Sequence, residues 1–260
     1  MDTISLSNSD DQSAREDPRT PIGGPLLAQT YRMLFIQMEY FPRGTLADLL
    51  RSRQRLCRGE NLRWLGNIAE GLLYLHNTQN VVHRDLKPTN IFVSKEAGLK
   101  IGDFGLAMRR DPAAGCPPNP PASLEQSIAG GSPLYCSPEQ MKEDGVNKSS
   151  DVFSLGIIAV EMYFVFNTQH ERIRVLTNAR QGVLPDELTA NYPEEARLFA
   201  EMLKESPSQR SPIRKVIKIL RKMLYDAETE SDGLDGDFVN TYASRIQVDA
   251  LDGPSSAVET

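Results

Sequence analysis

The sequence predicts an α+β fold that is mainly helical, with one strand and one β-hairpin in its N-terminal half. Two patterns carry this prediction. Apolar residues recur every three or four positions over long stretches after residue 60, which is typical of amphipathic helices. Two short apolar runs, "IFV" at 91–93 and "LKI" at 99–101, are separated by five residues that end in glycine, which is typical of a hairpin.

The N-terminal part of the chain predicts a disordered segment, a strand and two helices. Residues 1–30 are rich in Ser, Asp and Pro and have almost no apolar periodicity, so we expect disorder there. Strand-forming residues fill 31–41, and Pro42 and Gly44 then mark a tight connection. A short helix is expected over 45–53. A long amphipathic helix is expected through Leu62, Leu65, Ile68, Leu72 and Leu75.

The C-terminal half predicts a long loop followed by helices. Proline, glycine and alanine dominate 108–131, which indicates a long surface loop. The apolar segment 151–164 predicts a buried helix, because it is too short for a membrane span and contains Glu161. The next helix should place Ile173, Leu176 and Ala179 on one face. Two further helices are expected at 193–205 and 211–227.

The charge distribution separates two acidic ends from a mildly basic middle. Residues 1–30 carry five acidic and two basic side chains, and residues 226–260 carry nine acidic side chains and one arginine. We therefore expect one domain over 31–225, with a loose acidic tail over 226–260. This pattern suits an anionic ligand, and no aromatic-interleaved basic stripe suggests direct nucleic-acid binding.

Several classes of protein are disfavoured by what the sequence lacks. The three cysteines form no CxxC pair, so a zinc site or a disulfide framework is not expected. The N-terminus carries no apolar signal segment, and we expect no membrane association. A reducing compartment is therefore expected: the cytoplasm, with the nucleus as an alternative.

Four polar residues have the spacing of a phosphoryl-transfer site. Lys87 and Asn90 follow Asp85 by two and five residues, and Asp103 lies on the other side of the predicted hairpin. The hairpin should bring both carboxylates to one place. Carboxylate and amide oxygens suit Mg²⁺ bound together with phosphate, and a lysine can neutralise a phosphate oxygen. The bland reading, in which the two aspartates are loop acids or helix caps, explains neither the lysine nor the amide.

These residues lie in a series of motifs that resembles the protein kinases. The segment "HRDLKPTN" resembles the kinase catalytic loop, and "DFG" resembles the metal-binding motif. The ordered series also includes "SPE", which resembles the Ala-Pro-Glu motif, "SDVFSLG", which resembles the start of the central helix, and Arg210 in "SQRSP". The fold implied is a kinase large lobe, with a hinge strand and a hairpin.

The resemblance implies a role for each residue around the site. Asp85 would orient the substrate hydroxyl or accept its proton, and Lys87 would stabilise the transferring phosphoryl group. Asn90 and Asp103 would hold Mg²⁺, and the second substrate would be ATP. A lysine two positions after the catalytic aspartate, here Lys87, is typical of the serine/threonine kinases.

The implied adenine site lies in the "MEYF" segment. Met38 would be the gatekeeper of the pocket. The carbonyl of Glu39 and the N–H of Phe41 would bond adenine, and Phe92 would lie under the base.

Further residues match structural and regulatory positions of the family. His83 would pack against Phe104, the middle residue of a motif that ends at Gly105. Asp151 would anchor the backbone of the catalytic loop, and Arg210 would pair with the glutamate of "SPE", Glu139.

The loop 108–131 and its flank match a regulatory segment. Arg84 would pair with a phosphate on Ser127, although an unmodified, solvated serine is an equally good reading. Ser132 matches the residue that contacts the catalytic aspartate.

A narrower resemblance is to the kinases of the translation initiation factor 2 alpha subunit. It is carried by "LFIQMEYF", "GGSPLYCSPEQ" and the run from "DVFSLGIIAVEM" to "ERIRVLTNARQG". It implies regulation of translation under stress. It also implies that Thr168, Glu171 and Arg174 dock the protein substrate. Serine replaces the family's threonine at both loop positions, and dimerisation stays open.

Parts of the kinase pattern are not found upstream of the hinge. No GxGxxGxV loop or VAIK-like lysine precedes residue 31, and 1–30 resembles the end of a kinase insert. We therefore expect the small lobe to be absent from this sequence, with weak ATP binding and little or no turnover by the chain alone. The alternative function is a substrate-binding or scaffold module without catalysis.

Overall fold

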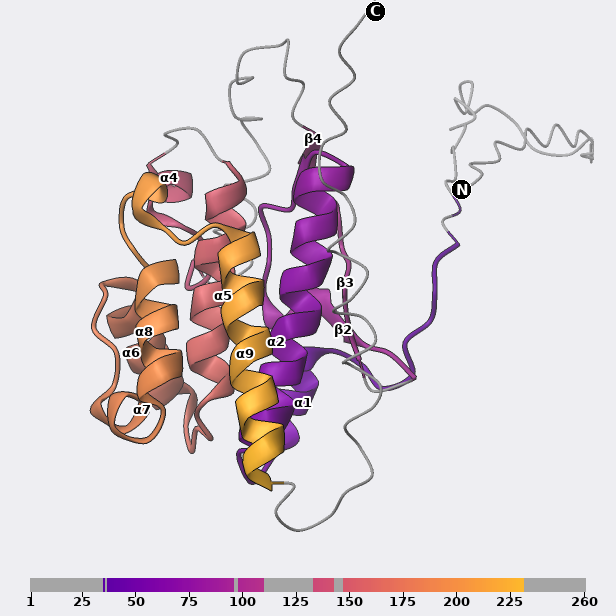
Figure 1. The fold of residues 1–260 in the computed structure, drawn as a ribbon. Helices are drawn as coiled ribbons and strands as arrows, with labels where there is room; N and C mark the ends of the chain where they lie inside the picture. The colour runs from indigo at the N-terminus through magenta and orange to yellow at the C-terminus, as the bar shows by residue number, and fades with distance from the viewer. Residues whose placement is uncertain (1–34, 36, 96–97, 110–132, 143–146, 232–260) are drawn as a thin grey trace, which may run out of the picture. The chain divides into compact units, whose positions relative to one another are not determined.

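The computed structural model describes residues 35, 37–95, 98–109, 133–142 and 147–231 (Figure 1). The chain divides into two units after Tyr40, and every helix and strand named below belongs to the second. The α+β, mainly helical fold class is confirmed. The helices are α1 (Leu46–Ser52), α2 (Arg58–Leu73), α4 (Pro138–Met141), α5 (Lys148–Met162), α6 (Gln169–Arg180), α7 (Asp186–Asn191), α8 (Pro193–Met202) and α9 (Ile213–Ser231).

Short elements connect these helices. A π-helical turn, η1 (Tyr74–Thr78), extends α2, and two 3₁₀ turns are η2 (Pro88–Asn90) and η3 (Pro207–Gln209). Two antiparallel pairs of strands are present in the described part of the chain. One joins β2 (Ile91–Val93) to β3 (Leu99–Ile101), and the other joins β1 (Val81–Val82) to β4 (Met108–Arg109).

Helix α5 is the centre of the core. Every residue from Ser150 to Met162 is buried, which explains why this segment is apolar on all sides rather than amphipathic. It packs against α2, α6 and α8. Helix α9 lies along α2, and the β2–β3 hairpin packs on α2 as well (Figure 1). The hairpin and the turns around it are therefore fixed to the core by α2.

Sequence signals for helix starts appear in the structure as hydrogen-bonded caps. Thr45 and Asp48 form a reciprocal capping box at α1, and Asn147 caps α5 with Ser150 as its partner. Thr168 caps α6 by accepting a hydrogen bond from the backbone N–H of Glu171. These caps satisfy backbone N–H groups that the helices themselves leave without partners.

Three sequence-based expectations are corrected or extended. A strand was expected over 31–41, but none is present in the described residues of that stretch, 35 and 37–41. A strand needs a neighbouring strand to bond its backbone groups. Ile173 is 49% exposed, whereas Leu176 and Ala179 are buried, so the expected three-residue apolar face is wrong at Ile173. Helices α4 and α7 and the β1–β4 pair were not predicted, because each is only two to six residues long.

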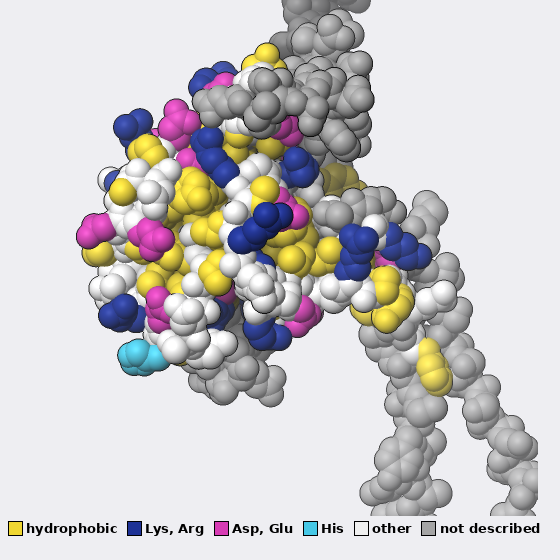
Figure 2. Space-filling model, turned by 90° about the horizontal axis from the view of Figure 1, so that it is seen from below, with side chains coloured by type: hydrophobic (Ala, Val, Ile, Leu, Met, Phe, Trp, Pro, Cys, Tyr) yellow, Lys and Arg dark blue, Asp and Glu magenta, His cyan; other side chains and the backbone are white. Residues whose placement is uncertain are grey.

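The surface of the second unit mixes residue types. On the face seen in Figure 2, Lys and Arg side chains alternate with Asp, Glu and hydrophobic side chains. Exposed hydrophobic side chains include Ile173 within α6, and Val165 and Val183 just outside its two ends. Among the described residues, no helix has the length and apolar character to cross a membrane.

Because Gly102 has no side chain, the Phe92 ring can lie close to the backbone at the end of the hairpin. We predict that Gly102→Ala is destabilising. A Cβ atom at this position would lie 2.6 Å from the Phe92 ring, closer than atoms of this kind can approach. We expect a loss of about 1–3 kcal/mol in the free energy of unfolding, measured by urea denaturation.

Gly66→Ala in α2 is the matched control for this prediction. Apart from its chain neighbours and the backbone of its own helix, no described atom lies within 4 Å of a Cβ at Gly66. Alanine inside a helix is favoured over glycine by about 0.8–1.0 kcal/mol, so this variant should be slightly more stable than the wild type. Equal stability of the two variants would show that Phe92 moves aside at little cost.

Candidate active site

A buried carboxylate fixes the backbone of the loop before β2. Asp151, in the first turn of α5, is fully buried and accepts hydrogen bonds from the backbone N–H of His83 at 2.9 Å and of Arg84 at 2.8 Å. Its Oδ2 also lies 2.7 Å from Nε2 of His76 in η1. Arg84 has a φ of 71°, which is unfavourable for a residue with a Cβ atom. The loop is thus held in a strained conformation by its surroundings.

The side chains of Lys87 and Asn90 both contact the carboxylate of Asp85, the next residue. Lys87 Nζ donates to Asp85 Oδ2 at 2.7 Å, and Asn90 Nδ2 donates to the same oxygen at 3.0 Å. Asn90 also donates to the backbone carbonyl of Asp85 at 2.9 Å. The carboxylate and ammonium groups are partly accessible, at 19% and 26% exposure, so a substrate can reach them.

The hairpin brings Asp103 to the same end of the structure as Asn90. Ile91 pairs with Ile101, and the Gly102 N–H donates to the Asn90 carbonyl at 2.9 Å. Asp103 directly follows Gly102, is exposed and has a φ of 58°. Two non-glycine residues in the left-handed region, Arg84 and Asp103, therefore flank this one small site.

His83 links the loop to the segment after β3. Its Nε2 lies 3.0 Å from the Gly102 carbonyl oxygen, and its ring meets the Phe104 ring edge-on at 5.3 Å. His83 is completely buried, whereas Phe104 is 49% exposed. Gly105 donates its backbone N–H to Asp103 Oδ1 at 3.4 Å, which closes the turn.

Two aromatic rings lie beside the hairpin. Phe41 stacks on Phe92, with ring centroids 5.0 Å apart, and Lys100 Nζ lies 5.7 Å from the centroid of Phe41. These rings form a flat apolar surface of the kind that a planar base can cover. Met38 and Glu39 belong to the first unit, so the structure does not place them relative to this surface.

A buried ion pair joins α4 to the segment before α9. Arg210 donates two hydrogen bonds to Glu139, at 2.6 and 2.7 Å, and both side chains are nearly inaccessible. Burial by itself would raise the pKa of Glu139, but hydrogen bonds from Arg210 and Ser150 lower it below its ordinary value. The Arg210 guanidinium also bonds the backbone carbonyls of Lys204, Ser149 and Glu205.

The remaining predicted residues are not all within this site. Ser127 and Ser132 lie outside the described residues. Arg84 is buried, and its backbone carbonyl accepts a hydrogen bond from Gln140 at 2.7 Å. Thr168 and Glu171 form the N-terminal cap of α6, and Arg174 is exposed on the same helix.

Sequence reasoning missed three residues that support the site. His76 contacts Asp151, and Tyr135 and Arg172 form a buried cluster with Glu161. The sequence signal for Tyr135 and Arg172 was indirect: Glu161 stands near the end of a largely apolar helix. No sequence signal indicated His76. A buried carboxylate needs partners, and these partners lie 11 and 26 residues away along the chain.

Comparison with known proteins gives consistent matches. The family model described as "Protein kinase domain" matches residues 27–221. The chain is 36% identical over 195 residues to eukaryotic translation initiation factor 2-alpha kinase 3 of Rattus norvegicus, covering 71% of this chain and 17% of the relative. It is 34% identical over 209 residues to the rat interferon-induced, double-stranded RNA-activated protein kinase, covering 78% and 38%.

A plant relative gives a similar match. The eIF-2-alpha kinase GCN2 of Arabidopsis thaliana is 33% identical over 201 residues, covering 74% of this chain and 16% of the relative. The chain therefore spans about one sixth of the length of the first of these relatives. The resemblance seen in the motifs is confirmed by these matches.

Proposed function

The chain belongs to the protein kinase family, and on this premise we propose that it transfers the γ-phosphoryl group of ATP to a serine or threonine hydroxyl of a protein. The observation that carries the proposal is the contact of Asp85 with Lys87 and Asn90 at the end of the hairpin that leads to Asp103. This is the residue set that positions a hydroxyl, a phosphate and a metal ion for phosphoryl transfer.

Asp85 and Lys87 would act directly on the reacting groups. The Asp85 carboxylate would accept a hydrogen bond from the substrate hydroxyl and orient its oxygen toward the γ-phosphorus. It would take up the hydroxyl proton as the new P–O bond forms and the bond from the γ-phosphorus to the bridging oxygen breaks, which releases ADP. The Lys87 ammonium, 2.7 Å from that carboxylate, would neutralise part of the charge on the transferred phosphoryl group.

Asn90 and Asp103 fit Mg²⁺ as ligands. The amide nitrogen of Asn90 donates to Asp85, so the amide oxygen points away from that carboxylate. Among the described residues, this oxygen accepts a long hydrogen bond of 3.4 Å from the Thr89 hydroxyl. The Asp103 carboxylate is exposed. Two protein oxygens are enough for Mg²⁺, which commonly takes its other ligands from water and phosphate. When bound, the ion would neutralise charge on the phosphates.

We assign the adenine to the aromatic surface beside the hairpin. The Phe92 ring, supported by Phe41, would lie under the base. The Phe41 N–H would donate a hydrogen bond to it. The family motif also assigns the Glu39 carbonyl to adenine and Met38 to the gatekeeper position. These assignments rest on the family motif and on the stacking of the two rings.

The proposed protein substrate is the alpha subunit of translation initiation factor 2. Two of the relatives carry this substrate in their names. Thr168, Glu171 and Arg174, at the start of α6, would form the docking surface for it. The chain would then regulate translation in the cytoplasm under stress, with Ser127 as a phosphorylation site that pairs with Arg84.

Transfer of radioactive γ-phosphate from ATP to the purified alpha subunit tests this proposal. We expect labelled phosphoserine or phosphothreonine, in an amount that depends on Mg²⁺. Binding of the subunit without any transfer would reject the kinase activity and favour the alternative, a binding module.

Docking through α6 predicts that Arg174→Glu weakens phosphorylation of the whole subunit but not of a short peptide. The charge reversal lies on an exposed face of the helix, so folding should be unaffected. We expect kcat/KM for the subunit to fall about tenfold, which corresponds to roughly 1.4 kcal/mol. Lys218→Glu on α9, also exposed, is the control. Equal losses for subunit and peptide would contradict docking at Arg174.

A further inference from the structure

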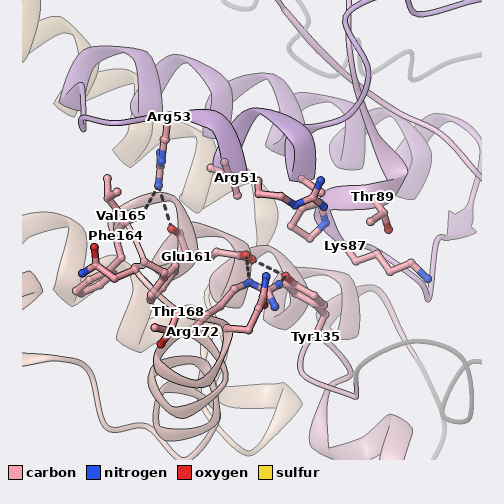
Figure 3. Close-up of a pocket in the computed structure, with 16 residues that line it drawn as sticks. Arg51, Arg53, Lys87, Thr89, Tyr135, Glu161, Phe164, Val165, Thr168 and Arg172 are labelled. Carbon is pink, nitrogen blue, oxygen red and sulfur yellow. Dashed lines mark hydrogen bonds and ion pairs between the residues drawn. The ribbon is translucent and has the colours of Figure 1, made fainter.

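The segment 133–137 forms a wall beside the proposed catalytic residues and contains no helix or strand. Tyr135, in this segment, lines a cavity of about 600 Å³ together with Lys87 (Figure 3). Burial raises the pKa of the Cys136 thiol, and the charges of Asp85 and Lys87 also act on it, so Cys136 lies near both groups. A substrate chain whose hydroxyl reaches Asp85 would therefore pass along this segment.

Side chains from two helices bond three successive backbone carbonyls of the segment. Arg180 Nη1, in the last turn of α6, donates to the Leu134 carbonyl at 2.9 Å and also to the Cys136 carbonyl. The Ser154 hydroxyl of α5 donates to the carbonyl between them, that of Tyr135, at 2.8 Å. A segment outside helices and strands has no regular partners for its carbonyls, so these donors decide where its backbone lies.

The catalytic loop has an anchor of its own, so the segment and the loop can be separated by experiment. Asp151 accepts hydrogen bonds from two backbone N–H groups directly before Asp85. The segment is joined to this loop through α4, where Gln140 Nε2 donates to the Arg84 carbonyl at 2.7 Å. Loss of the Arg180 contacts should therefore displace the segment while Asp85 keeps its place.

A basic residue in the last turn of a helix often serves that helix alone, by interacting with its C-terminal carbonyls. Arg180 instead bonds carbonyls that lie 46 and 44 residues away along the chain. Its guanidinium carbon also lies 5.5 Å from the centre of the Phe153 ring of α5. Burial lowers the pKa of Arg180, which shows that placing its charge here has a cost. These contacts indicate a role for Arg180 in the segment 133–137 rather than in α6 alone.

We propose that Arg180 is a positioning residue: it holds the carbonyls of Leu134 and Cys136 and thereby fixes the wall along which the substrate hydroxyl approaches Asp85. The proposal rests on the proposed kinase function and adds a residue to it. Helix α6 then has two roles, since its start carries the proposed docking residues and its last turn supports this wall. Transfer to a protein hydroxyl depends on Arg180, whereas transfer to water does not.

Two rates, measured on the same preparation, test the proposal. One is transfer of γ-phosphate from ATP to the alpha subunit of translation initiation factor 2. The other is hydrolysis of ATP, in which water attacks the γ-phosphorus and ADP and phosphate are released. In Arg180→Met, which nearly keeps the length of the side chain but has no donor, we expect the first rate to fall about 10–100-fold and the second to stay unchanged. A loss of folded protein would lower both rates by the same factor.

Three further variants make the result specific to the carbonyl contacts. Arg180→Lys keeps a charged donor and should recover most of the lost rate. Met141→Leu removes the sulfur atom that Arg180 Nη2 contacts at 2.9 Å and should leave both rates unchanged. If circular dichroism shows that Arg180→Met is unfolded, Arg180→Gln, which is also uncharged, takes its place.

Hydrogen–deuterium exchange of the same variants gives a readout that needs no turnover. The backbone N–H of Cys136 donates to the Pro133 carbonyl at 3.3 Å, and we expect it to exchange faster in Arg180→Met. Added alpha subunit should slow exchange in the segment 133–137 of the wild type. In Arg180→Met this protection should be smaller or lost.

Three results would overturn the proposal and leave the kinase function intact: equal losses of both rates in folded Arg180→Met, an unchanged rate of protein phosphorylation, or unchanged exchange in the segment 133–137. If the wild type transfers no phosphate, the kinase proposal fails, and protection by the alpha subunit then decides on Arg180. A difference in protection between the wild type and Arg180→Met supports positioning of the bound substrate, and no difference rejects it.

Discussion

Replacing Asp85 with asparagine should lower the rate of phosphate transfer by about 10²–10⁴-fold, because the amide cannot take up the hydroxyl proton. The substitution removes one charge and keeps the shape of the side chain. The amide oxygen can still accept the hydrogen bonds that Lys87 and Asn90 donate to Oδ2 of Asp85. We therefore expect the loop to keep its conformation while the chemical step slows.

This prediction separates loss of chemistry from loss of structure. The measurement is kcat with saturating peptide and ATP, together with the midpoint of thermal unfolding. Asp186→Asn, at the exposed start of α7, is a matched control and should retain full activity. A variant at Asp85 that keeps more than a tenth of the wild-type rate would exclude this carboxylate as the proton acceptor.

The sequence predicted those parts of the fold that depend on local pattern. The β2–β3 hairpin has the predicted bounds, and α1, α2, α8 and α9 lie within a few residues of the predicted ranges. The periodicity of Leu62, Leu65 and Ile68 places all three in the core. Because Asp85, Lys87 and Asn90 lie within six residues of each other, their contact also followed from a local motif.

What the sequence could not predict depends on contacts between distant segments. The contact of Asp151 with His76 of η1, 75 residues away, was not predicted, whereas its contacts with the catalytic-loop backbone were implied by the family resemblance. Strands β1 and β4 pair through two residues each, Val81 with Arg109 and Val82 with Met108. A strand of two residues is too short to show an alternating pattern in the sequence. The exposure of Ile173 likewise depends on which neighbours pack against α6 rather than on the sequence of α6.

Arg210→Met is expected to destabilise the chain by about 3–5 kcal/mol, the usual cost of leaving a buried charge without its partner. Glu139 would keep only its hydrogen bond from Ser150 and a backbone contact. Three backbone carbonyls would also lose their donor. Methionine roughly fills the space of the arginine side chain, so a change in volume contributes little to the loss.

The free energy of unfolding is measured by urea denaturation at pH 7, followed by the fluorescence of Trp64, the single tryptophan, which is buried in α2. Arg63→Met is the control, because its 3.6 Å ion pair with Glu228 is exposed. Exposed pairs contribute about 0–1 kcal/mol, so this variant should be nearly as stable as the wild type. Similar losses in both variants would show that burial of the Arg210–Glu139 pair has no special consequence.

The stability difference between the wild type and Arg210→Met should also depend on pH. The pKa of Glu139 is lowered in the folded chain, so its ionised form contributes stability at pH values above the ordinary glutamate pKa of 4.5. That contribution is lost as the pH falls through the lowered pKa. In Arg210→Met, burial without the guanidinium should raise the pKa of Glu139, so protonation relieves the buried charge at a higher pH. The difference should therefore be constant near neutral pH and shrink as the pH falls toward 4, and a difference that grows on acidification would contradict this account.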